Sequence, residues 1–224
     1  MYTPPMFKSD RAASLAFAEA RGFGTACAWD GKRPIASSLP FYLSYAADGT
    51  PTALFHVARN NALIGAADGV TPWVLAINGA DAYVTPDWYV SVDQVPTWLY
   101  QAVHLTGPVR TLSEAELVTQ IDTLSAKFES RLVPKKPWTS AKMTAARLEA
   151  LKKGIVGLAM QVEDVEGSFK LNQHKSEADF AAVAGGLAAM PDHGSQSIAR
   201  LMREVRPQAF AATNNETVPL EGSM

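Results

Sequence analysis

Four short stretches of this 224-residue chain gather side chains that could bind a ligand. In FHVARNNAL, residues 55–63, Arg59, Asn60 and Asn61 stand where a β-like run ends and a short helical piece begins. A guanidinium, amide donors and the backbone N–H groups of a helix start suit a phosphate. The same residues also fit an ordinary helix cap beside a solvated arginine, so the stretch alone leaves both readings open.

The second stretch is ASSLPFYL, residues 36–43, in which Ser37 and Ser38 precede a buried run. Hydroxyls and strand backbone at such a place can hydrogen-bond the edge of a flat heteroaromatic ligand. Pro40 supports a second reading, an edge or bulged strand whose serines face solvent.

The remaining two stretches are aromatic and basic. Trp88, Tyr89, Trp98 and Tyr100 lie within thirteen residues and predict the wall of a planar cofactor, a dimer interface or an aromatic core. FKLNQHKSEAD, residues 169–179, collects hydrogen-bond donors and positive charge directly before a helix cap. This last stretch predicts a site for an anion or for an electron-rich ring edge, or else a basic surface loop.

The elements that must position these residues are mainly short strands. Turn signals at residues 30–31 and 48–49 and short β-compatible runs predict strands over 23–29, 33–45, 51–57, 71–79, 82–89 and 97–110. Alternating apolar residues predict a last strand over 155–165, with a turn at 166–167 leading into 168–171. Helices are expected after Asp10, after a capping box formed by Ser113 and Glu116, near 144–151, and in two closing segments. This order favours an antiparallel barrel with helical additions, of mixed α+β class, over a doubly wound α/β fold. We expect one domain over residues 1–206 and a disordered tail over 207–224.

Composition and missing motifs exclude several classes of function. No dinucleotide-binding, P-loop or nucleophile-elbow motif occurs, and the four histidines lack metal-binding spacing. The net charge of −2 makes direct nucleic-acid binding doubtful. The single cysteine, the absence of a long apolar run and the N-terminal sequence lead us to expect a cytoplasmic protein with no membrane association.

Taken together and in order, the four stretches resemble the PaiB-type family of FMN-binding proteins. The resemblance rests on MYTPPMF, GFGT, ASSLP, FHVARNN, DAYVTPDWY, VPTWLYQAVHLTG, the PW connector, KGIVG and FKLNQHK, and it covers about residues 1–190. It implies an antiparallel split β-barrel related to pyridoxamine-phosphate oxidase, acting as a homodimer with FMN at the subunit interface. The implied cofactor-binding residues are His56, Arg59 and Asn60 near the phosphate, Ser37, Ser38 and Leu39 beside the ring, Trp98 and Tyr100 as a wall, and Lys170 and Gln173 from the C-terminal segment.

The chain departs from the family pattern at two places. Leu99 stands where the family usually has Asn, and the family's KLSQN segment is KLNQH here, with Asn172 and His174. Loss of an amide beside the aromatic wall changes the polarity expected for the pocket.

The resemblance and the chemistry leave three functional hypotheses. The first is a flavin-binding negative transcriptional regulator, as members of this family are described. The second is an FMN-dependent oxidoreductase acting on a small molecule. The third is a haem-binding or haem-degrading protein on the same barrel, with His104 or His174 as the proximal ligand.

Overall fold

The computed structural model describes residues 1–214, and these fall into two compact units. The barrel unit comprises Met1, Asp10–Ile77 and Val103–Glu166. The C-terminal unit comprises Tyr2–Ser9, Asn78–Ala102 and the described residues from Gly167 onward. That residues 1–206 fold as one domain stays a prediction.

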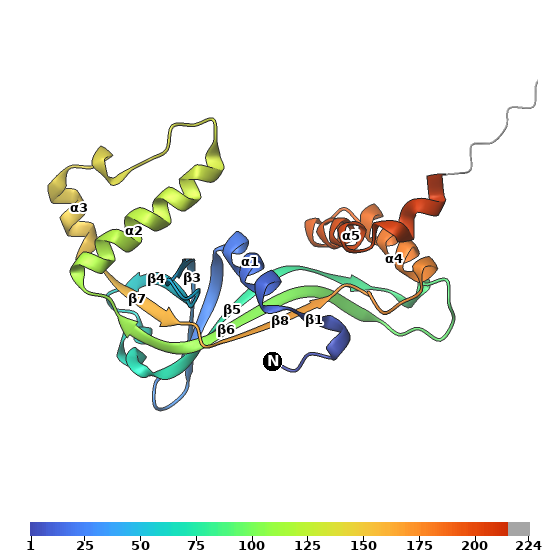
Figure 1. Cartoon of the computed structure of the whole chain (residues 1–224), viewed down its shortest axis with the longest axis horizontal. Coiled ribbons are helices and arrows are strands. Elements are labelled where there is room, and N and C mark those ends of the chain that lie inside the picture. The colour runs from blue at the N-terminus through green and yellow to red at the C-terminus, as the bar shows by residue number, and fades with distance from the viewer. Residues whose placement is uncertain (215–224) are drawn as a thin grey trace, which may run out of the picture. The chain divides into compact units, whose positions relative to one another are not determined.

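The barrel unit is built from antiparallel strands that close on themselves (Figure 1). The strands are β2 (Phe23–Trp29), β3 (Pro34–Tyr45), β4 (Pro51–Ala58), β5 (Asp68–Val84), β6 (Thr97–Thr111), β7 (Ile155–Gln161) and β8 (Asp164–Lys170), of which β5, β6 and β8 have residues in both units. Their order includes β6-β5-β2-β3-β4-β7, and β7 pairs antiparallel with both β4 and β6, which closes the barrel. The predicted antiparallel split barrel with added helices is therefore confirmed.

Alternation of side chains along each strand builds the barrel core. In β4, Ala53, Phe55 and Val57 are buried while the residues between them are only half-buried. Because directly opposite residues of antiparallel strands share a face, Phe41 of β3 and Leu158 of β7 pair with Phe55 and join the same core.

Two predicted segments are corrected. The run over residues 82–89 is not a single strand, because β5 ends at Val84 and the 3-10 helix η3 (Pro86–Trp88) follows. This helix begins with a proline, which has no backbone N–H to donate to a sheet. The turn predicted at residues 166–167 occurs at residues 162–163 instead. There the amide of Glu163 donates to the carbonyl oxygen of Thr106 (2.9 Å), which bends the chain between β7 and β8.

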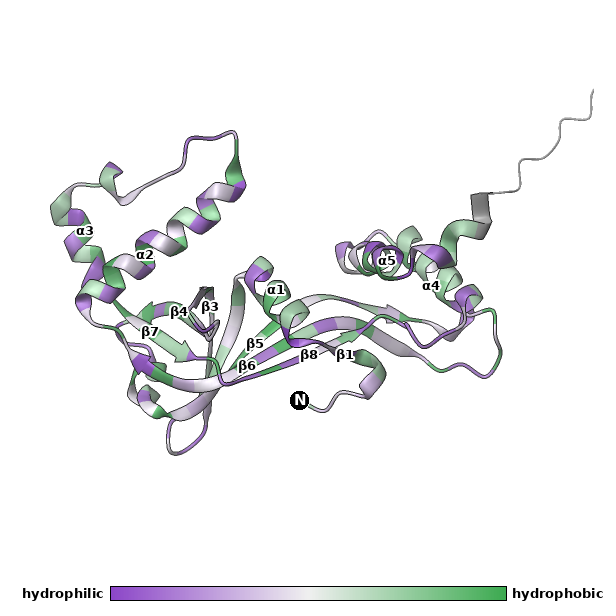
Figure 2. Cartoon of the chain, in the orientation of Figure 1, coloured by the Kyte–Doolittle hydropathy of each residue, from purple (hydrophilic) through white to green (hydrophobic). Residues whose placement is uncertain are grey.

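The barrel unit carries three α-helices, and their ends follow from local capping. In α1 (Arg11–Arg21), the carboxylate of Asp10 accepts a hydrogen bond from the first turn, and Gly22 ends the helix in a left-handed conformation (φ 57°). In α2 (Glu114–Glu129), Ser113 and Glu116 form the predicted capping box. Hydrophilic and hydrophobic residues alternate along α2 (Figure 2). Both α2 and α3 (Ala145–Lys152) contact β7.

The C-terminal unit combines strand ends with a pair of helices. Its elements are η1 (Pro5–Phe7), β1 (Lys8–Ser9), which pairs with β8, then η3, α4 (Glu177–Ala189), α5 (His193–Val205) and η6 (Pro207–Asn214). Phe180, Val183 and Leu187 of α4 pack with Ile198 and Met202 of α5 in a buried apolar cluster. The predicted disordered tail is corrected over residues 207–214, where η6 forms and Phe210 contacts Phe180 (6.0 Å between ring centroids); the rest of the tail lies outside the described residues.

Closure of the barrel generates a test at Gly107 of β6. A Cβ atom at this position would overlap the backbone carbonyl of Gln161 at the end of β7. We expect Gly107→Ala to lower the free energy of unfolding by about 3 kcal/mol, as overpacking against rigid backbone does. Urea denaturation checks this, with Gly65→Ala as the control because the added methyl meets nothing within 4 Å. Equal losses in both variants would contradict a close approach of β6 to β7.

Candidate functional site

A flat face of small side chains lies on the outside of strands β5, β2 and β3. The register pairs Thr25 with Ser38 and Ala76, and Cys27 with Ala36 and Val74. The intervening residues of β2, such as Ala26, are buried, so these side chains point away from the core. We call this face the outer patch and define it by its six residues, Thr25, Cys27, Ala36, Ser38, Val74 and Ala76.

The outer patch has the properties of a surface that receives a planar molecule. None of its side chains is larger than valine, and each is at least partly exposed. The hydroxyls of Thr25 and Ser38 lie 3.2 Å apart and hydrogen-bond each other. Phe23 and Trp29 stand at the two ends of the same face of β2, with 49% and 55% of their surfaces exposed. A flat apolar surface with central hydroxyls and aromatic ends suits a heteroaromatic ring or a partner protein.

The three residues predicted beside a ring are divided between two faces of β3. Ser38 belongs to the outer patch, whereas Leu39 is 3% exposed and lies in the core. Ser37 pairs with buried Ala26 and accepts a hydrogen bond from Asn61 Nδ2 (2.9 Å). Asn61 Oδ1 in turn accepts from the amide of Leu63 (3.0 Å). Ser37 therefore anchors the chain that follows β4, and of the three only Ser38 presents its side chain to the outer patch.

Arg59 is bonded within the protein. Its Nε and Nη2 atoms donate to the carbonyl oxygens of Lys153 and Ile155, the latter at 3.0 Å. Its backbone amide donates to Gly154 (2.9 Å), so Arg59 ties the end of β4 to the segment between α3 and β7. Asn60 lies beside it in an exposed turn.

After Asn60 the chain does not form the predicted phosphate site at a helix start. The helix is η2 (Ala62–Ala66), a five-residue 3-10 helix whose amide at Leu63 is already capped by Asn61. A phosphate contact from Arg59 or Asn60 stays a prediction, and it has no support from amides of this helix.

His56 faces α2. It is half-buried on β4, and its Nδ1 atom lies 3.4 Å from Nε2 of Gln120. Burial lowers the pKa of His56, and the hydrogen bond with Gln120 opposes that shift only in part. The ring therefore binds a proton less readily than a solvent-exposed histidine does.

The other four predicted residues belong to the C-terminal unit. Trp98 is 53% exposed and makes an edge contact with Tyr83, at 6.1 Å between ring centroids, and Tyr100 is half-buried. Lys170 Nζ donates to Thr97 Oγ1 (2.6 Å). No single unit brings all ten predicted residues together: the barrel unit holds six (Ser37, Ser38, Leu39, His56, Arg59 and Asn60) and the C-terminal unit holds four (Trp98, Tyr100, Lys170 and Gln173).

The side-chain amide of Gln173 is hydrogen-bonded to backbone groups of the chain. Its amide nitrogen donates to the carbonyl oxygens of Met6 (3.0 Å) and Phe169 (2.6 Å), and its oxygen accepts from the amide of Leu171 (2.8 Å). These bonds fix the turn after β8 against the N-terminal segment. A cofactor contact from Gln173 therefore stays a prediction without support from its geometry.

The sequence reasoning overlooked most of the outer patch. Thr25, Cys27, Val74 and Ala76 belong to it, and none was singled out. The alternation of small residues in GFGTACAW, residues 22–29, carried the signal for the β2 half of this face. The residues of β5 on this face could be identified only from the register of the pairing between β5 and β2.

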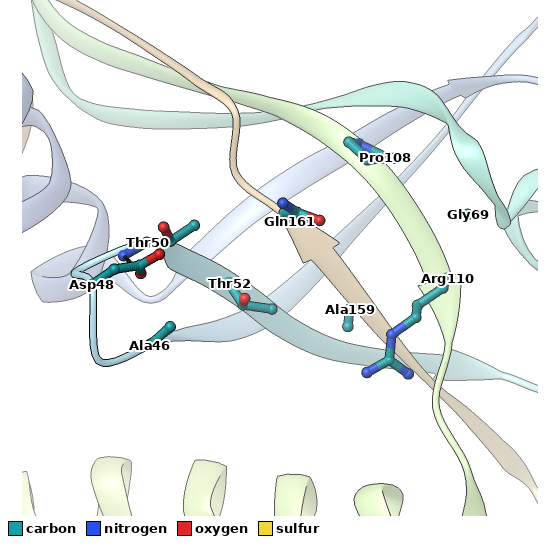
Figure 3. A pocket seen from close by; sticks show the side chains of 9 residues that line it. All are labelled: Ala46, Asp48, Thr50, Thr52, Gly69, Pro108, Arg110, Ala159 and Gln161. Carbon is teal, nitrogen blue, oxygen red and sulfur yellow. Dashed lines mark hydrogen bonds between the residues drawn. The ribbon is translucent and has the colours of Figure 1, made fainter.

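A concave region of about 410 Å³ lies beside the turn between β3 and β4 and beside β4, β5, β6 and β7 in the barrel unit (Figure 3). Its charged groups already have partners. Arg110 forms an ion pair with Glu116 (2.7 Å), and that hydrogen bond, together with those from Ser113, lowers the pKa of Glu116 to about 2. Asp48 accepts from the amide of Thr50 (2.9 Å) in its turn. This region is therefore a cleft whose charged side chains are already paired. It lacks the convergent free polar groups of a reactive site.

The closed antiparallel sheet with its added helices defines a protein of the split-barrel class. The profile of the family described as "Putative FMN-binding domain" matches residues 1–164. "Protease synthase and sporulation protein PAI 2" of Bacillus subtilis (strain 168) is 30% identical over 205 residues, covering 91% of this chain and 97% of that protein. The chain belongs to this family of FMN-binding, PaiB-type split-barrel proteins.

Other likenesses are more distant, and the solved structures among them share the fold. "Uncharacterized protein AN0679" of Emericella nidulans is 28% identical over 135 residues, 54% of each chain. The structure of the FAD and haem binding protein from Mycobacterium smegmatis superposes with a TM-score of 0.54 at 14% identity, covering 78% of this chain and 79% of that one. The conserved hypothetical protein Rv2991 from Mycobacterium tuberculosis gives 0.52 at 9% identity, covering 75% and 90%.

Two features are absent from the described residues. None of the helices in residues 1–214 combines the length and the apolar character needed to span a membrane. Across the same residues, histidine, cysteine and acidic side chains do not gather in threes where a metal ion could be held.

The lowered pKa of His56 predicts a pH dependence of stability. Between the ordinary histidine pKa of 6.5 and the lower folded value, the unfolded chain binds the extra proton, so stability falls as the pH drops through this window. His56→Gln should remove that part of the dependence. Urea unfolding of both proteins at several pH values from about 7.5 to 5 measures it. Identical pH profiles would show that the His56 ring is protonated as readily in the folded chain as in the unfolded one.

Proposed function

We propose that the chain is an FMN-binding homodimer in which the outer patch of one copy receives the flavin ring. The observation that carries this proposal is the row of small side chains with paired hydroxyls, in a chain that belongs to an FMN-binding family. FMN supplies hydride and single-electron transfer when bound, and the protein contributes binding and orientation.

The residues present fit a planar cofactor at the outer patch. The side chains of Ala36 and Ala76 leave the sheet surface open to close approach. The hydroxyls of Thr25 and Ser38 can each donate and accept, which suits the mixed donors and acceptors on the edge of a flavin ring. Their role is to hold the ring in one orientation.

A second copy of the chain supplies the missing wall in this proposal. Phe23 and Trp29 of the barrel unit and Tyr83 and Trp98 of the C-terminal unit are large apolar side chains with 47–55% of their surfaces exposed. Aromatic residues of this kind are enriched at protein interfaces, where burial removes their apolar surface from water. Trp98 and Tyr100 of the second copy would then enclose the ring, as the family resemblance implies.

The patch makes a direct prediction for flavin affinity. Ser38→Trp should weaken FMN binding at least tenfold, because an indole would occupy the place of the ring, whereas Ala47→Trp in the exposed turn after β3 should leave it unchanged. Quenching of FMN fluorescence measures both. Sedimentation of the unmodified protein should give twice the 24.0 kDa chain mass. A monomer, or equal affinities for the two variants, would exclude this site.

A role in gene regulation is a second proposal, and it rests on the helix pair of the C-terminal unit. Helices α4 and α5 are separated by three residues, 190–192, a spacing found in helix-turn-helix modules that the sequence did not reveal. His193, Arg200 and Arg203 are exposed on α5. The Bacillus subtilis relative is named for protease synthesis and sporulation.

Fluorescence anisotropy of labelled DNA from upstream of the chain's own gene tests the regulatory proposal. We expect saturable binding at about 0.15 M salt that weakens at least tenfold in an Arg200→Glu, Arg203→Glu double variant. A Lys8→Glu, Lys32→Glu double variant, which reverses two exposed charges outside α5, is the matched control for charge. Equal loss in the control, or no binding by the unmodified protein, would argue against DNA contact through α5.

No observation of a comparable kind supports the haem hypothesis. His104 is half-buried in the barrel unit, and His174 is exposed in the C-terminal unit, where its ring packs edge-on against Phe7.

A further inference from the structure

The C-terminal unit contains a cavity of about 300 Å³ that is separate from the outer patch. It lies between the N-terminal segment around Phe7, the loop over residues 89–97 and the turn that follows β8. Lys170, Lys175 and His174 line it, and none of its eleven lining residues is acidic. The cavity therefore gathers positive charge with no acidic side chain in its lining.

The two ammonium groups are held by neutral partners only. Lys170 Nζ donates to Thr97 Oγ1 and Lys175 Nζ donates to Gln94 Oε1, both at 2.6 Å. No carboxylate of the described residues lies within ion-pair distance of either lysine. Each ammonium carries three donors, so further donors remain for an anion. Two partly buried charges without a counter-ion favour binding of one.

A tyrosine hydroxyl adds a third donor. Asn172 is 1% exposed and has a left-handed backbone (φ 60°), and its Nδ2 atom donates to the hydroxyl of Tyr89 (2.9 Å). Because that hydroxyl accepts from Asn172, its own proton remains available to donate. The nearby carboxylate of Asp179 is occupied by the amides of Val90 and Ser91 and by the Ser91 hydroxyl (2.8–2.9 Å).

The rest of the lining is apolar and aromatic. Pro4, Met6, Phe7 and Val95 contribute it. The ring of His174 meets the Phe7 ring edge-on at 5.3 Å, and Lys175 Nζ lies 5.1 Å from the centroid of Tyr89. A ligand with an anionic head and a flat apolar body would use both kinds of surface.

The lining is positioned before any ligand arrives. The three hydrogen bonds of Gln173 fix the turn after β8 to the N-terminal segment, and Lys175 closes that turn through its amide to Asn172 (2.9 Å). Burial lowers the pKa of His174, and the charges of Lys175 and Lys170 lower it further, which is consistent with a positive potential in the cavity.

We propose that this cavity binds a small carboxylate with an aromatic or other apolar body, its head held by Lys170, Lys175 and Tyr89. Its volume lies at the small end of ligand pockets, which favours a molecule of about the size of benzoate. The proposal gives Lys170 a ligand other than the flavin. It does not rest on the proposed flavin site, because every group it uses belongs to the C-terminal unit.

Calorimetric titration with benzoate tests the proposal. We expect saturable binding of one benzoate per chain, at least tenfold weaker in Lys170→Met and in Lys175→Met and lost in the double variant, because each change removes a charge while keeping an apolar stem. Tyr89→Phe should also weaken binding. Lys8→Met, which removes an exposed charge of the same unit outside the cavity, should bind as the unmodified protein does.

Two further titrations distinguish this cavity from a nonspecific apolar surface and from the flavin site. Benzamide has the same shape without the charge, so it should bind at least tenfold more weakly than benzoate. Benzoate should bind equally well in the presence and absence of saturating FMN. The proposal would be overturned if benzamide bound as tightly as benzoate or if FMN displaced benzoate. It would also be overturned if the double variant had the melting temperature of the unmodified protein and still bound benzoate with unchanged affinity.

Discussion

The pairing of β7 with both β4 and β6 is the constraint on which the barrel unit depends. It places Met160 opposite Ala53 on one side and Val109 on the other, so a single strand joins the two edges of the sheet. Closure leaves little room between the strands, and Gly107 meets the backbone of Gln161 where only a hydrogen atom fits. Once the sheet is closed, every strand has one face in the core and one outside.

That assignment of faces decides which residues can meet a ligand. Ser37 and Ser38 are neighbours in sequence, but successive side chains of β3 point to opposite faces, so Ser37 lies toward Asn61 and Ser38 toward the outer patch. The two units then offer different chemistry. The barrel unit presents a flat, uncharged surface suited to a ring, whereas the C-terminal unit presents ammonium groups around a small cavity suited to an anionic head.

Much of the fold could be predicted because its signals are local. The turn signal at residues 30–31 marked the end of β2, and the capping box of Ser113 and Glu116 marked the start of α2. Such signals depend on neighbours within a few residues. The turn after β7 was misplaced because it is set by the amide of Glu163 reaching Thr106, a contact absent from local sequence.

The candidate site was less predictable because the partners of polar residues lie far away in the chain. Arg59 suited a phosphate in sequence, yet its guanidinium binds carbonyls about a hundred residues later, at Lys153 and Ile155. Gln173 similarly bonds Met6. The family resemblance identified the cofactor class without revealing which of these groups are already used within the chain.

The chain's single cysteine offers the most direct measurement of the central claim, that FMN covers the outer patch. Cys27 lies at the centre of this face, half-buried, between Ala36 and Val74. The rate of its alkylation by iodoacetamide should fall at least tenfold when FMN saturates the protein, with the fall following the fraction of sites occupied. An unchanged rate with FMN fully bound would show that the flavin lies elsewhere.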